Sequence, residues 1–187
     1  MRKVVVYHLL SLDGVSEEPG DWMSDTGREV FDDLAAVIAT QDTVLLGRGT
    51  YEYWSGYWLT STVQPFADFI NGTPKHVFAS TRPSRHWHGS TFVTAPAAEH
   101  VARLKEGRGG DIGVHGSTTL ARSLLQARLV DELRLVVAAS LARSGRTLFD
   151  AAGGDATGGG TATPVHGLRL VQARSTPAGS LLLHYAC

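Results

Sequence analysis

The chain has 187 residues, of which 43% are hydrophobic and 19% charged, and its 17 basic and 18 acidic side chains give a formal net charge of -1. These values lie close to globular averages, so we expect one domain, spanning residues 1–187, with a substantial core. The balanced charge gives no support for nucleic acid or a membrane surface as a partner. No run approaches the 18 apolar residues that would predict a membrane-spanning helix.

Two features bear on the compartment. The apolar run near the start reaches Asp13 too soon for the core of a signal peptide, and no small-residue cleavage site follows it. Cys187 is the single cysteine, so an intrachain disulfide is impossible. A reducing compartment fits this composition, and we expect a cytoplasmic protein.

Strands alternate with helices in the first part of the chain. Residues 3–10 are almost continuously apolar, which predicts a central strand buried on both faces. The capping-box pair Thr26 and Glu29 predicts the start of a helix, and residues 43–46 predict a second strand before a second helix that opens at Thr50. The apolar residues of the first helix recur at helical spacing: Phe31, Leu34, Val37 and Ile38.

The alternation continues and then changes. Residues 75–79 and 91–93 predict strands, and a helix is expected to start at Pro96 and stop at Gly107. Residues 111–114 predict another strand, followed by a helix capped at Ser117.

The last part of the chain predicts strands with no helix between them. They cover residues 133–138, 168–173 and 181–185, with a hairpin turn at 178–179, and we expect a mobile surface loop over residues 151–164. The fold class is therefore α/β, with a mostly parallel sheet that ends in antiparallel strands at its C-terminal side.

Several common catalytic motifs are missing from the sequence. It contains no Walker A loop, GxGxxG, HExxH or GxSxG. The pair His86 and His88 has no third ligand nearby, so we expect no metal site.

A strand followed by glycine, a hydroxyl residue and a helix start occurs twice, at residues 47–50 and 116–119. Helix starts present unpaired N–H groups and a partial positive charge, and glycine lets a ligand approach the backbone, so each junction can hold a phosphate. Arg48 and Arg82 follow strand ends, where guanidinium groups suit a phosphate monoester. Two phosphate sites and a further basic site match the needs of NADPH, although either junction alone is more often a simple helix cap.

Four segments resemble a known family: SLDGV at 11–15, LLGRGTYE at 45–52, VHGSTTLARSLLQARLVDELRL at 114–135 and GRTLFD at 145–150. Together they resemble the dihydrofolate reductase-like superfamily, and more narrowly the branch that contains the C-terminal reductase domain of the bifunctional riboflavin-biosynthesis deaminase/reductase. The resemblance implies a three-layer dihydrofolate reductase-like fold, an NADPH-dependent reductase and a homodimer.

The resemblance also assigns residues by position. It implies that Gly47, Arg48, Gly49 and Thr50 bind the cofactor at one turn. Three residues near the adenosine phosphate and three at the pyrophosphate complete the set: Ser80, Thr81, Arg82, Gly116, Ser117 and Thr118. Residues 11–14 match the loop beside the nicotinamide and the substrate.

The substrate side carries the remaining candidates. Asp13 is the ionisable group of its loop and is the candidate proton donor if its environment raises its pKa, whereas as an ordinary Asp-Gly pair it would only cap the turn. We expect Ser11, Gly14, Trp22 and Trp54 to contact the substrate, because aromatic walls suit a flat heterocycle. Core packing is the alternative for the aromatic residues.

Two departures from the family affect the expected substrate. Residues 142–145 read Ala-Arg-Ser-Gly where a Gly-x-Gly turn is usual in the reductase branch, and the position of the pterin-binding carboxylate of dihydrofolate reductases falls near Phe31, which argues against folate. We expect an NADPH-dependent reductase of a small planar heterocycle, such as a pterin or pyrimidine, or of a related C=N or C=O substrate. The alternatives are a nucleotide-binding or sensing protein without turnover and a flavin-binding oxidoreductase.

Overall fold

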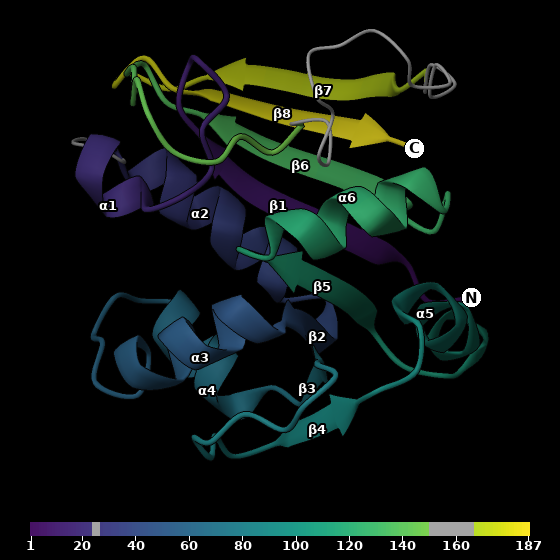
Figure 1. The fold of residues 1–187 in the computed structure, drawn as a ribbon. Coiled ribbons are helices and arrows are strands. Elements are labelled where there is room, and N and C mark those ends of the chain that lie inside the picture. The colour runs from purple at the N-terminus through teal and green to yellow at the C-terminus, as the bar shows by residue number, and fades with distance from the viewer. Residues whose placement is uncertain (24–26, 150–166) are drawn as a thin grey trace, which may run out of the picture.

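The computed structural model describes residues 1–23, 27–149 and 167–187. Across these ranges the strands form one sheet in the order β4-β3-β2-β5-β1-β6-β8-β7 (Figure 1). The strands are β1 Val4–Leu10, β2 Gln41–Gly47, β3 Lys75–Phe78, β4 Ser90–Val93, β5 Asp111–His115, β6 Glu132–Val137, β7 Arg169–Ser175 and β8 Leu181–Ala186. The helices are α1 Pro19–Trp22, α2 Gly27–Ile38, α3 Arg48–Tyr57, α4 Phe66–Gly72, α5 Ala97–Glu106 and α6 Thr118–Gln126.

The pairing of the strands confirms the predicted fold class. Strands β4, β3, β2, β5, β1 and β6 run parallel to one another, while β8 is antiparallel to β6 and β7 is antiparallel to β8. The predicted central strand is correct, because β1 lies between β5 and β6 and is buried along nearly its whole length. The predicted hairpin turn is also present, since the N–H of Gly179 donates to the carbonyl of Thr176 between β7 and β8.

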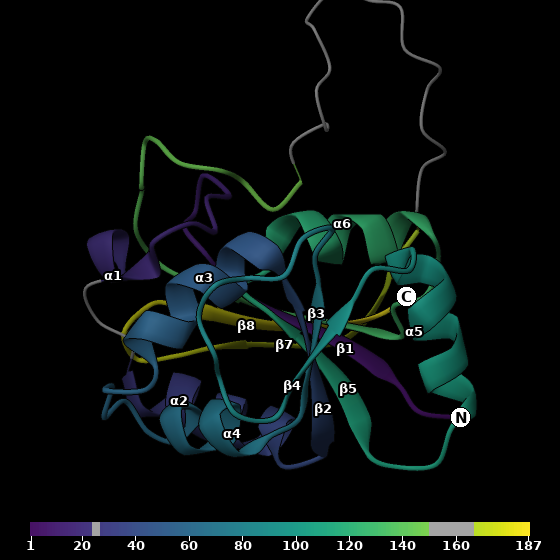
Figure 2. The same ribbon diagram turned by 60° about the horizontal axis from the view of Figure 1, so that its bottom comes forward.

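Helices cover both faces of the sheet, giving three layers (Figure 2). On one face α5 and α6 pack on β1, β5 and β6 through residues such as Val101, Leu120 and Leu124. On the other face α2 and α4 pack on the sheet through residues such as Val30 and Ile70. Each of these side chains is at least 90% buried, so the burial of apolar surface on two faces stabilises the sheet.

The connections of β2 and β5 determine where a ligand can bind. These two strands are parallel neighbours, with Leu45 opposite Val114. The chain leaves β2 through α3 and α4 toward β3 on one side, whereas it leaves β5 through α6 and passes β1 to reach β6 on the other side. Because the two connections diverge, a crevice opens beyond the carboxyl ends of β2 and β5, which is where open α/β sheets bind ligands.

Some local predictions differ from the structure. Helix α3 begins at Arg48 rather than Thr50, since Gly47 is already its N-cap. Helices α1 and α4 were not predicted because each is short, seven residues or fewer, and gives little periodic signal. The expected cap at Thr26 and the expected loop at 151–164 lie outside the described residues.

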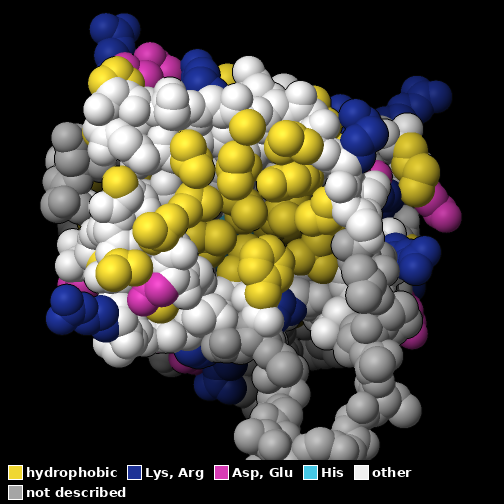
Figure 3. Space-filling view, turned by 90° about the horizontal axis from the view of Figure 1, so that it is seen from above, with side chains coloured by type: hydrophobic (Ala, Val, Ile, Leu, Met, Phe, Trp, Pro, Cys, Tyr) yellow, Lys and Arg dark blue, Asp and Glu magenta, His cyan; other side chains and the backbone are white. Residues whose placement is uncertain are grey.

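Two further features concern the surface. Among the described residues, every helix is too short or too polar to span a bilayer. Apolar side chains gather on the face seen in Figure 3, and the exposed apolar side chains of β7, β8 and the residue before β7 lie at this end of the sheet. They are Leu168, Leu170, Val171 and Leu181, which we call the β7–β8 patch.

Candidate functional site

The two glycine turns meet through hydrogen bonds. The N–H of Gly47 at the end of β2 donates to the Ser117 hydroxyl over 3.0 Å, and the Thr50 hydroxyl donates to the Gly116 carbonyl over 3.3 Å. Ser117 is the N-cap of α6 as predicted, but its side chain makes no cap bond within its own helix. The hydroxyl of Ser117 instead joins the starts of α3 and α6 into one unit.

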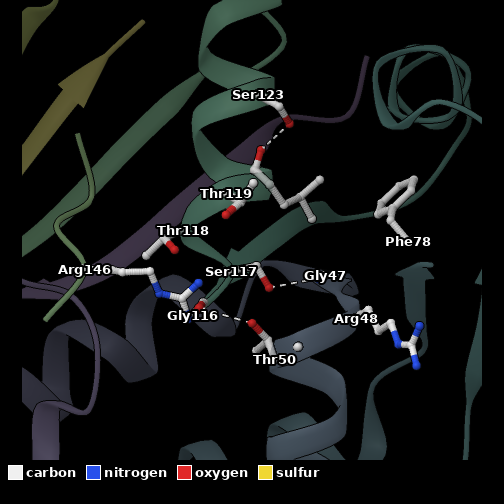
Figure 4. Close-up of a pocket in the computed structure, with 12 residues that line it drawn as sticks. Gly47, Arg48, Thr50, Phe78, Gly116, Ser117, Thr118, Thr119, Ser123 and Arg146 are labelled. Atoms are coloured by element: carbon white, nitrogen blue, oxygen red, sulfur yellow. Dashed lines mark hydrogen bonds between the residues drawn. The ribbon is translucent and has the colours of Figure 1, made fainter. Parts of the chain in front are cut away.

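A cavity of about 370 Å³ lies between these helix starts (Figure 4). Its lining carries hydroxyl, glycine and guanidinium groups, and among the described residues that line it none is acidic. An anion would meet hydrogen-bond donors and positive charge on several sides. The lining residues are Gly47, Arg48, Gly49, Thr50, Phe78, Gly116, Ser117, Thr118, Thr119, Leu120, Ser123 and Arg146.

Gly116 is required by its surroundings. Its φ of 63° lies in the left-handed region, and a Cβ at this position would overlap the ring of Trp54. The backbone of the second turn can therefore lie against the indole only if residue 116 has no side chain. Trp54 of α3 therefore packs against the backbone of the second turn.

Arg48 connects the first turn to the segment that follows β3. Its guanidinium donates to the Thr81 hydroxyl and forms an ion pair with Glu52 at 2.8 Å one helical turn later. Arg82 lies over the ring of Phe92 at 5.2 Å. Residues 80–82 do not line the cavity, but the bond from Arg48 to Thr81 brings this segment to its rim.

Asp13 is held in an environment opposite to the one that a proton donor needs. Its carboxylate accepts hydrogen bonds from the Ser11 hydroxyl at 2.6 Å and from the N–H groups of Ala142 and Arg143 at 3.0 and 2.9 Å. These bonds lower the pKa of Asp13 to about 2. The condition attached to the predicted proton donor, a raised pKa, is therefore not met, because the donors stabilise the ionised carboxylate.

The Asp13 loop is joined to residues 140–148 along its length. Leu12 donates to the Ser140 carbonyl over 2.8 Å, and Val15 forms an antiparallel bridge with Thr147. Gly145 has a φ of 118°, and a Cβ there would lie 2.7 Å from the Val15 side chain. The Val15 side chain can therefore lie against the second segment only because residue 145 has no side chain.

The family model of the RibD C-terminal domain matches residues 2–182. The chain belongs to the RibD C-terminal domain family. It is 31% identical over 151 residues to the uncharacterized protein YwjB of Bacillus subtilis (strain 168), an alignment that covers 79% of this chain and 83% of that one.

Solved structures give the same fold for this RibD C-terminal domain protein. A Shewanella sp. PV-4 protein, provisionally named a riboflavin biosynthesis protein, has a TM-score of 0.74 at 16% identity, with 98% of each chain covered. A Thermotoga maritima diaminohydroxyphosphoribosylaminopyrimidine deaminase/5-amino-6-(5-phosphoribosylamino)uracil reductase has a TM-score of 0.68 at 14% identity, covering 99% of this chain and 56% of that one. Both likenesses confirm the dihydrofolate reductase-like fold.

The aromatic candidates of this RibD C-terminal domain protein are mainly packing residues. Trp22 is buried, and its indole N–H donates to the Glu17 carbonyl over 2.8 Å. Trp54 is half-buried and makes edge contacts with the rings of Trp58 and Phe66. Neither lines the cavity, so any substrate contact from these residues stays a prediction.

Arg146 lines the cavity but was not among the predicted site residues. The sequence could have indicated Arg146, because it is the one cation of the GRTLFD segment that carries the family resemblance. Among the described residues there is no cluster of His, Cys, Asp and Glu able to hold a metal ion.

Proposed function

We propose that the protein is an NADPH-dependent reductase whose cofactor diphosphate binds between the starts of α3 and α6. The observation that carries this proposal is the pair of hydrogen bonds that join the Gly47 turn to the Gly116 turn beside the cavity. The comparisons add support, since the chain belongs to the RibD C-terminal domain family and the Thermotoga maritima protein with the same fold is named a reductase of a uracil derivative.

The residues of the cavity fit a dinucleotide. The first-turn N–H groups of α3 and α6 have no partners within their own helices, so they are available to phosphate oxygens. Ser117 already accepts a bond from Gly47, and a hydroxyl that accepts can still donate its own proton. Guanidinium groups stand at two sides of the cavity, from Arg48 and Arg146.

Arg48, with Ser80, Thr81 and Arg82, is the proposed site of the adenosine 2'-phosphate. Arg48 and Thr81 are already in contact, and Arg82 is anchored over Phe92 nearby in the chain. A planar guanidinium with hydroxyl groups beside it matches a doubly charged phosphate monoester. This grouping supports NADPH over NADH as the cofactor.

The chemistry divides between cofactor and protein. A bound reduced nicotinamide supplies the hydride, and the chain holds the acceptor against it. Asp13 is ionised at neutral pH, so we assign it to binding. Its two oxygens accept hydrogen bonds from Ser11, Ala142 and Arg143 and keep room for a further N–H from the substrate. The proton that accompanies the hydride then comes from water.

The substrate is proposed to be a small planar heterocycle of the pterin or pyrimidine type, held near Ser11, Asp13 and Gly14, with Trp22 and Trp54 as the candidate aromatic contacts. Anaerobic mixing of the protein with NADPH and a panel of such compounds tests this reading. Oxidation that depends on one compound of the panel supports the reductase. Tight NADPH binding with no oxidation by any compound would favour the alternative, a nucleotide sensor.

We also infer a homodimer that buries the β7–β8 patch. Strand β7 is an edge strand, and Leu170, Val171 and Leu181 are 52%, 46% and 41% exposed. An exposed edge strand beside an apolar patch makes a monomer prone to aggregation, and a second copy of the chain related by two-fold symmetry would cover both. Light scattering should give twice the 20.0 kDa chain mass, and Leu170→Glu should shift it toward one chain. A monomeric wild type would contradict this inference.

A further inference from the structure

Arg146 lines the cavity and also binds Glu17, three residues after the loop at residues 11–14. It lines the cavity, and Figure 4 shows its guanidinium pointing toward Gly116. The same guanidinium donates two hydrogen bonds, from Nε at 2.9 Å and Nη2 at 2.7 Å, to one carboxylate oxygen of Glu17. The other oxygen of Glu17 accepts the backbone N–H of Arg146 at 3.2 Å.

The backbone on both sides of this ion pair is fixed. Ser16 donates its N–H to the Arg146 carbonyl over 3.0 Å, and Leu148 donates to the Gly14 carbonyl over 3.2 Å. The Ser16 hydroxyl is also bonded to Nδ1 of the buried His8 at 2.8 Å. Movement at this junction is therefore left to the long side chains of Glu17 and Arg146, which are 36% and 66% exposed.

We propose that Glu17 competes with the bound diphosphate for the guanidinium of Arg146, so that cofactor binding breaks this ion pair and frees the side chain of Glu17. This inference rests on the proposed function, because the competitor is the cofactor diphosphate. Arg146 is then a positioning residue that connects the cofactor cavity to the loop assigned to the substrate.

The charges favour such an exchange. The diphosphate carries more negative charge than one carboxylate, and it would be surrounded by the helix starts that line the cavity, so it attracts the guanidinium more strongly than the partly exposed Glu17 does. Hydrogen bonds from Arg146 lower the pKa of Glu17, so the competitor is ionised at neutral pH. Because coupling between two sites is reciprocal, release of Glu17 by the cofactor requires that removing the Glu17 charge strengthen cofactor binding.

The test is calorimetric titration with NADPH and with inorganic pyrophosphate at low and physiological salt. Glu17→Gln keeps the size of the side chain and should tighten binding of both probes roughly two- to fivefold, the range expected when an exposed ion pair stops competing. Arg146→Ala should weaken binding roughly tenfold, because it removes a charge-assisted donor. The double variant should bind like Arg146→Ala alone, and Glu106→Gln at the far end of α5 is the matched control that should change nothing.

Amide hydrogen exchange supplies a second readout that does not depend on turnover. NADPH should speed exchange of the Arg146 backbone amide in the wild type, because that N–H loses the Glu17 carboxylate as its acceptor, and should have no such effect on the amide of residue 146 in Arg146→Ala. Binding of NADPH that is equal in the wild type and Glu17→Gln, or a Glu17→Gln effect that persists without Arg146, would overturn the competition while leaving the proposed cofactor intact. No binding of NADPH to the wild type would overturn both.

Discussion

The backbone N–H of Gly47 and the hydroxyl of Ser117 form a 3.0 Å hydrogen bond that joins two turns 70 residues apart in the sequence. Ser117 is 4% exposed, so the bond is shielded from water. It fixes the distance between the starts of α3 and α6, and with it the width of the cavity assigned to the diphosphate.

Removing the Ser117 hydroxyl should therefore affect both stability and binding. Ser117→Ala leaves the Gly47 N–H without its partner, and we expect a loss of about 1–2 kcal/mol in the free energy of unfolding by urea denaturation. NADPH affinity should fall as well. Ser123→Ala in the same helix is the control for stability, because its hydroxyl bonds only one turn back, to the Leu120 carbonyl. Equal losses for the two variants would contradict the role given to Ser117.

A side chain at residue 116 should be poorly tolerated. Gly116→Ala forces a left-handed backbone on a residue with a Cβ and drives that Cβ into the Trp54 ring, so we expect a loss of about 2–4 kcal/mol. Gly49→Ala is the matched control, since a Cβ there meets no atom within 4 Å and lies in a helix. This control should be neutral or slightly stabilising. Adding Trp54→Leu to each variant separates overlap with the Trp54 ring from strain in the left-handed backbone. Thermal unfolding should show that the added change restores part of the lost stability for Gly116→Ala and none for Gly49→Ala.

Arg48 should determine the preference between the two nicotinamide cofactors. Arg48→Ala should weaken NADPH roughly tenfold and NADH far less, because only NADPH has the 2'-phosphate that a guanidinium grips with two bonds. The NADPH affinity of Arg48→Lys should lie between those of the wild type and Arg48→Ala. Titrations with both cofactors measure this, with Arg82→Ala as the second candidate. Arg28→Ala, exposed on α2 and paired only with Asp32 among the described residues, is the control. An equal loss for NADPH and NADH would exclude Arg48 as the 2'-phosphate ligand.

Two buried histidines predict sensitivity to acid. Burial lowers the pKa of His8 to about 4 and that of His115 to about 3, from 6.5 in the unfolded chain. Between pH 6.5 and 4 the unfolded chain therefore binds protons that the folded protein does not, so stability falls as pH falls, by up to about 3 kcal/mol for each histidine.

The contribution of one histidine can be measured by difference. His115→Phe fits among the rings of Tyr7, Phe66 and Phe69, although it costs the bond to Gln41, and it should flatten the fall of unfolding free energy below pH 6.5. Denaturation by urea at several pH values gives the slope. An unchanged slope would mean that His115 is not kept neutral by the fold.

The strands were predictable from the sequence because most of the parallel ones are apolar runs, which can be identified without knowing the strand that each pairs with. The order of the strands was not predictable from periodicity. That β2 and β5 are neighbours, and hence that Gly47 lies beside Gly116, follows from long-range pairing, and here the family resemblance supplied it. Helix α4 was missed although Phe66, Phe69 and Ile70 are spaced as in a helix, because seven residues give too short a pattern.

The chemistry of individual side chains was less predictable. Asp13 was a candidate acid until the structure brought the N–H groups of Ala142 and Arg143 to its carboxylate from about 130 positions away in the chain. Arg146 enters the site in the same way, through a loop that meets Glu17 only in the folded protein. Such contacts leave no local pattern, since neither partner shows which distant segment will lie beside it.

A crystal structure of the protein grown with NADPH tests the central claim most directly. The account predicts the diphosphate between the first turns of α3 and α6, within hydrogen-bond distance of the Ser117 or Thr118 hydroxyl, with the adenosine 2'-phosphate on Arg48. A nucleotide bound away from both turns, or a cavity that stays free of nucleotide at saturating concentration, would contradict it.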